Sequence, residues 1–151
     1  MAYTTEEGRT QILDESANAV RDLAEAVAAL GDAYEQLDED SGDRLEAQLF
    51  KPLQSAYGQL QRTHTDFAAR VNLTAARFGA PEPLAVADAH SLIERAADAI
   101  QAADDGLAEL QDTLLPVEVG DQELRSGLSA VRTVIASLPE ACDEFIRTLG
   151  R

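Results

Sequence analysis

The apolar residues of this chain fall into four long series in which successive members are alternately three and four positions apart. This spacing places the members of a series on one side of an α-helix. The series run through residues 13–37, 50–78, 86–114 and 124–149, with breaks rich in Gly, Pro and Asp near 38–43, 78–83 and 115–121. The pattern predicts four helices, over about 5–38, 43–78, 83–114 and 121–149.

Small residues beside the first series indicate that its helix contacts more than one neighbour. A two-stranded coiled coil would place charges at these positions. This segment instead carries Ala17, Ala19, Ala24, Ala26 and Ala33. A wide apolar side is typical of helices in bundles. Because short connections make consecutive helices antiparallel, the sequence predicts an all-α, antiparallel up-down-up-down four-helix bundle, forming one domain over residues 1–151.

Two prolines, Pro52 and Pro139, lie inside the helical series. Proline removes a backbone N–H and clashes with the preceding helical turn. We therefore expect the bundle to be kinked near each of them.

The chain is strongly acidic, with 28 Asp and Glu against 12 Lys and Arg and a formal net charge of −16. Repulsion from phosphate argues against nucleic acid and anionic membranes as direct partners. The longest stretch without a charged side chain, residues 52–61, is far shorter than the roughly 20 residues of a membrane span, so we expect no membrane insertion and a cytoplasmic protein. The acidity fits a halophilic host, which we favour slightly, or an acidic protein from an Arg-favouring, high-GC genome.

A polar pair is expected inside the core. His64 occupies a core position of the second series, and Ser16 is the one polar member of the first. In an antiparallel hairpin that turns near residue 40, positions 16 and 64 lie at the same height. No carboxylate and no Gly-rich oxyanion loop accompany the pair. We therefore interpret it as a structural layer, in which a hydroxyl satisfies a buried imidazole.

The two histidines lack the neighbours that a metal centre in a helical bundle requires. Di-iron bundles repeat a Glu-x-x-His pattern on two helices. The residues three before His64 and His90 are Gln61 and Ala87. His90 and Glu94 could share a metal on one helix face, but the two histidines are expected at different heights. No phosphate-binding, dinucleotide or HExxH motif occurs. We therefore expect no metal, no cofactor and no catalytic residue, and hence no enzyme.

The segment Ala89-His90-Ser91-Leu92 resembles the phosphoacceptor motif of histidine phosphotransfer domains, which are also helical bundles. The resemblance covers four residues and implies phosphotransfer through His90. That family continues with Lys and Gly, where this chain has Ile93 and Glu94, and the carboxylate would oppose a phosphate. Phosphotransfer through His90 is kept as an alternative function.

The segment 41–80 differs from the rest of the chain because it carries three acids and five bases. Its outward positions are small and weakly charged, as in many protein interfaces. The residues expected in such an interface are Arg62, Thr65, Ala69, Asn72, Leu73 and Ala76. We expect a non-catalytic interaction or scaffold protein that binds a protein partner, or a second copy of itself, through this face. A small-ligand sensor with a cavity opened at Pro52 or Pro139 is the other alternative.

Overall fold

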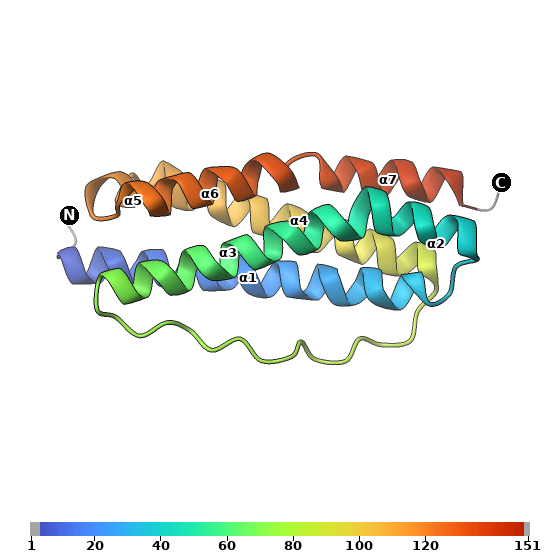
Figure 1. Ribbon diagram of the computed structural model, residues 1–151, viewed down its shortest axis with the longest axis horizontal. Coiled ribbons are helices and arrows are strands. Elements are labelled where there is room, and N and C mark those ends of the chain that lie inside the picture. The colour runs from blue at the N-terminus through green and yellow to red at the C-terminus, as the bar shows by residue number, and fades with distance from the viewer. Residues whose placement is uncertain (1–3, 150–151) are drawn as a thin grey trace.

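All regular structure in the described part of the chain is helical, as the sequence predicts. The computed structural model describes residues 4–149. Its helices lie side by side along one long axis (Figure 1). They are, in chain order, α1 (Thr5–Tyr34), α2 (Glu39–Leu45), the π-helical turn η1 (Glu46–Phe50), α3 (Lys51–Arg70), α4 (Ala89–Asp112), α5 (Leu115–Glu118), α6 (Gln122–Ile135) and α7 (Leu138–Thr148).

The helices do not alternate in direction, so the predicted up-down-up-down order is wrong. α3 returns antiparallel to α1 after a short turn (Figure 1). α4 is also antiparallel to α1, because Glu25 pairs with Arg95 while Gln36, just after α1, reaches Ala87, just before α4. α3 and α4 therefore point the same way, and the connection between them runs along the length of the molecule (Figure 1).

This connection, residues 71–88, begins because α3 ends at Arg70 and not at the predicted position 78. We call it the strap. Asn72 adopts a φ of 58°. The N–H of Leu73 donates to the carbonyl of Ala68 at 3.0 Å, and that of Asn72 donates to the carbonyl of Ala69 at 3.3 Å. These bonds form a Schellman motif, in which a left-handed Gly or Asn closes a helix. Leu73 then packs against the core.

The strap stays extended because its sequence cannot continue a helix. Pro81 and Pro83 lack an N–H and disfavour the helical conformation of the residue before each. Helix formation resumes where Asp88 accepts the N–H of Ser91 at 2.8 Å as an N-cap. The third predicted helix, over 83–114, accordingly begins late, at Ala89.

The two internal prolines are accommodated in different ways. Just before Pro52, the N–H of Lys51 donates to the carbonyl of Glu46, five residues back, in the π-helical turn. One extra residue in the turn lets the helix pass the proline without ending. At Pro139 the helix is broken into α6 and α7, and the proline lies in the first turn of α7, where its missing N–H leaves no bond unmade.

The core is aliphatic and contains one polar pair. Ser16 and His64 are the polar side chains that are buried within residues 4–149. Every buried side-chain nitrogen or oxygen in this range has a hydrogen-bond partner. Large side chains that fill the interior of the bundle include Ile12, Leu23, Leu60, Phe67, Ile100 and Phe145.

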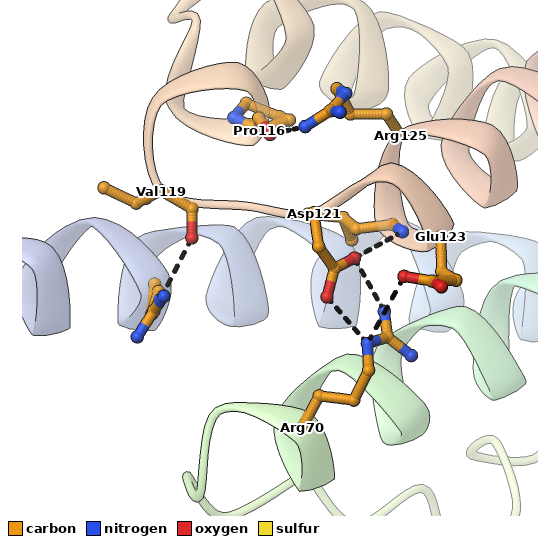
Figure 2. A network of polar contacts seen from close by, with 8 residues as sticks. Arg70, Pro116, Val119, Asp121, Glu123 and Arg125 are labelled. Carbon is orange, nitrogen blue, oxygen red and sulfur yellow. Dashed lines mark hydrogen bonds and ion pairs between the residues drawn. The ribbon is translucent and has the colours of Figure 1, made fainter.

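A polar network holds the turn before α6 against α1 and α3 (Figure 2). Asp121 caps α6 by accepting the N–H of Leu124 at 2.8 Å, and it accepts two further bonds from Arg70, at 2.7 and 2.9 Å. Arg9 donates to the carbonyl of Val119 at 3.0 Å. The hydrogen bond from Arg70 is the main cause that lowers the pKa of Asp121, so the carboxylate stays charged at neutral pH.

Replacing Asp121 with alanine should lower the free energy of unfolding by about 2 kcal/mol, because it removes a helix cap and the partner of Arg70 together. Asp88→Ala is the matched control, since Asp88 caps α4 without an arginine partner, and should cost about 1 kcal/mol. Urea denaturation of both variants measures the difference. Equal losses would mean that the pair with Arg70 contributes nothing.

Candidate functional site

His64 joins three parts of the chain. Its Nδ1 lies 2.8 Å from the Ser16 hydroxyl of α1, at the height that the hairpin arithmetic predicts. Its Nε2 accepts the backbone N–H of Ala76 in the strap at 3.0 Å. The ring also meets Phe78 edge to face, with the ring centroids 5.3 Å apart. A single imidazole of α3 therefore ties the strap to α1.

The hydrogen bonds define the protonation state of His64. Because Nε2 accepts an N–H, it carries no proton, so Nδ1 carries the proton and donates to Ser16. The Ser16 hydroxyl in turn donates to the carbonyl of Leu13 at 3.1 Å. Burial, and then the positive charge of Arg21, lower the pKa of His64, while Asp14 acts in the opposite direction. His64 is thus neutral at pH 7, and its lone pair is already engaged by the strap.

His90 lies at the surface, in the first turn of α4. Its side chain is 58% exposed, and Nε2 lies 2.6 Å from the Glu94 carboxylate one turn later. Glu94 therefore engages one of the two ring nitrogens of His90. Within residues 4–149, no group of three or more His, Cys, Asp and Glu side chains is arranged to hold a metal ion.

Cys142 is buried in α7. Burial is the main cause that raises the pKa of its thiol to about 12. At neutral pH it is therefore a protonated core side chain and a poor nucleophile.

The structure separates the six residues that the sequence places in one interface. Arg62, Thr65 and Ala69 are exposed on α3. The other three lie beyond the end of that helix: Asn72 closes it, Leu73 packs against the core and Ala76 binds His64. A continuous helical face across all six residues does not exist.

The pocket beside the π-helical turn does not include either proline. It has a volume of about 210 Å³ and is lined by Gly31, Tyr34, Glu46 and Phe50. Another pocket, of about 440 Å³, lies between α1 and the strap. This pocket depends on the strap, which the apolar spacing of the sequence does not reveal.

Two segments without any acidic residue, 47–65 and 124–139, are brought together by the packing of α3 against α6. Their backbones approach so closely at Thr63 and Gly127 that a Cβ added to Gly127 would lie 2.3 Å from the Thr63 hydroxyl oxygen. We call the outer side of this pair the α3–α6 face. It is formed by Ser55, Gln59, Arg62, Thr65 and Ala69 of α3 with Ser126, Ala130 and Thr133 of α6.

The α3–α6 pair carries more basic than acidic residues, whereas the α1–α4 pair is acidic. α3 carries three basic residues and one acidic residue, and α6 carries two and one. The neighbouring pair α1 and α4 is strongly acidic: α1 has seven acids and two bases, and α4 has six acids and one base. The sequence signal for this face is the acid-free segment 124–139. It indicates a face only once the fold has placed this segment next to 47–65.

No helix in the described range has an apolar stretch long enough to cross a membrane. The described geometry therefore offers one polar core layer, one exposed His–Glu pair, a pocket under the strap and the α3–α6 face, which has few acidic residues, exposed Asp66 lying between Thr65 and Ala69 along α3. The chain matches no protein-family model, no curated protein and no solved structure.

Proposed function

We propose that this chain is a non-catalytic interaction protein that binds a protein partner, or a second copy of itself, through the α3–α6 face. The observation that carries the proposal is the adjacency of two acid-free segments in a chain of net charge −16. An approaching protein surface meets least repulsion there. Most side chains of the face are small and uncharged, which allows close packing with little desolvation cost.

Charge complementarity suggests the nature of the partner surface. Lys51 and Arg62 of α3 form no ion pair among the described residues and offer positive charge to a partner, whereas the α1–α4 pair is acidic. An acidic partner, including the α1–α4 side of a second copy, fits this face. Such complementarity acts mainly on the rate of association and on the choice of partner.

The proposal is tested by placing carboxylates on the face. Thr65→Glu with Ala69→Glu adds two negative charges at exposed positions of α3. The matched control, Thr10→Glu with Gln101→Glu, adds the same charge at exposed positions of α1 and α4. Sedimentation velocity measures self-association, and crosslinking in the native host followed by mass spectrometry measures binding of other proteins.

The face variant should associate at least about tenfold more weakly than wild type, since like charges at an interface are strongly unfavourable. The control should not weaken association, because a more acidic α1–α4 surface stays complementary to the basic residues of α3. If both double variants behave as wild type does, or if both lose association equally, the α3–α6 face is not the binding surface.

Phosphotransfer through His90 has weaker support. Exposure of the ring favours it, but Glu94 holds Nε2, and a phosphorylated imidazole there would face this carboxylate. Incubation with a phosphodonor should leave His90 of the wild-type protein without label. Stable phosphohistidine in wild type would instead establish the alternative function.

A further inference from the structure

The pocket between α1 and the strap has one helical wall and one extended wall. One wall is α1, which contributes Val20, Arg21, Ala24 and Glu25, and the other is the middle of the strap, residues 77–84. Arg95 of α4 closes one side. The volume of about 440 Å³ falls in the range that small-molecule sites occupy.

The strap is attached at both sides of this pocket. At one end Ala76 donates its N–H to His64, and Phe78 packs on the same ring. At the other end the carbonyl of Ala87 accepts the side-chain amide of Gln36 at 2.7 Å. Between these attachments, Gly79, Pro81 and Pro83 are exposed. The pocket is therefore held open by fixed ends, with no helix filling the space.

Positive charge collects at this pocket although the chain is acidic. Three arginines and two glutamates line it. Arg95 is neutralised by Glu25, with Nε and Oε1 2.9 Å apart. Arg21 and Arg77 form no ion pair with any carboxylate among the described residues, in a chain that contains 28 acids. Two guanidinium groups thus keep their charge available at one site.

Apolar groups complete the lining. Phe78 lies under the Arg21 guanidinium, whose central carbon is 5.8 Å from the ring centroid. Leu84 adds aliphatic surface on the strap wall. Guanidinium groups bind carboxylate and phosphate oxygens through paired hydrogen bonds, and apolar walls bind a hydrocarbon or aromatic body.

We propose that this pocket binds a small organic anion, with its carboxylate or phosphate on Arg21 and Arg77 and its apolar body against Phe78 and Leu84. The site is separate from the α3–α6 face, and its ligand is a small molecule rather than a protein. The unpaired arginines and the strap pocket carry the inference together.

Benzoate and phenyl phosphate are suitable probes, with benzamide as the neutral control of the same shape. Titrations followed by amide NMR shifts should show both anions perturbing strap residues 77–84 and α1, with benzamide binding at least about tenfold more weakly. The tighter of the two anions identifies the head group. Binding should weaken as salt concentration rises.

Arg21→Gln and Arg77→Gln should each weaken binding by about tenfold, which corresponds to the loss of one charge-assisted contact. Arg147→Gln is the control, because Arg147 is an exposed arginine of α7 that lies outside both the pocket and the α3–α6 face. Circular dichroism confirms that the variants are folded. The proposal is overturned if neither anion binds, if benzamide binds as tightly as benzoate, or if Arg147→Gln weakens binding as much as the pocket variants.

Discussion

His64→Ala is expected to lower the free energy of unfolding by about 3–4 kcal/mol, more than a typical truncation on the surface. The loss has two physical sources. Removing a buried ring leaves a cavity next to Phe78, and it leaves the N–H of Ala76 without its acceptor. Ser16→Ala should cost less, about 1–2 kcal/mol, because it removes one hydroxyl and leaves one imidazole N–H unpaired. Urea denaturation monitored by circular dichroism measures both.

The pH dependence of stability should also depend on His64. Its pKa in the folded state lies below the ordinary value of 6.5, so the unfolded state binds more protons at pH values between the two. His64 therefore lowers stability as pH falls from 6.5 toward its folded-state pKa, and it adds no further slope below that value. Wild type should lose stability more steeply in this window than His64→Ala.

Parallel pH curves for wild type and His64→Ala would contradict this account of the strap. The comparison with His64→Ala isolates the contribution of the ring. It is needed because Asp14 and Arg21 also act on the pKa of His64, and because carboxylates, of which the chain has many, ordinarily titrate at lower pH. Hydrogen exchange gives an independent measurement. The amide of Ala76 should be protected in wild type and should exchange much faster in His64→Ala.

Replacing glycine with alanine should change the free energy of unfolding in opposite directions at Gly127 and Gly106. Gly127→Ala should lower the free energy of unfolding by about 1–3 kcal/mol, because the added Cβ overlaps the Thr63 side chain of α3. Rotation of Thr63 cannot remove the overlap entirely, since its own Cβ would be only 3.1 Å away. The two helices would have to separate.

Gly106→Ala is the matched control, because a Cβ added at this helical glycine of α4 meets no atom within 4 Å. This variant should gain about 0.5–1 kcal/mol, since glycine is a poor helix former. Thermal melting of the two variants should therefore shift in opposite directions. Stabilisation by Gly127→Ala would mean that α3 and α6 are not in close contact there.

The sequence was sufficient for those features that depend on short-range pattern. Apolar spacing identified the helical segments, and a single turn near residue 40 was enough to place Ser16 opposite His64. Each of these inferences uses one helix or one hairpin. Pro139 was likewise recognised as a disturbance because its effect is local.

The strap was missed because its start resembles a continuing helix. Val71 and Phe78 fit the apolar spacing of α3, yet Asn72 adopts the left-handed conformation that ends the helix. The sequence around Pro81 and Pro83 is typical of a short turn, which would reverse the chain, whereas the structure has an extended segment there. The α3–α6 face was missed for a related reason, since it depends on which helices become neighbours after the strap has carried the chain across the molecule.

His64 fixes the strap to the bundle through a neutral ring whose Nε2 accepts the N–H of Ala76. Long-range ¹H–¹⁵N correlation NMR of the histidine rings reports the protonation of each nitrogen. At neutral pH, His64 should show a protonated Nδ1 and an unprotonated Nε2. A ring that is protonated on Nε2, or on both nitrogens, could not accept this bond, and the arrangement of the strap and its pocket described above would be wrong.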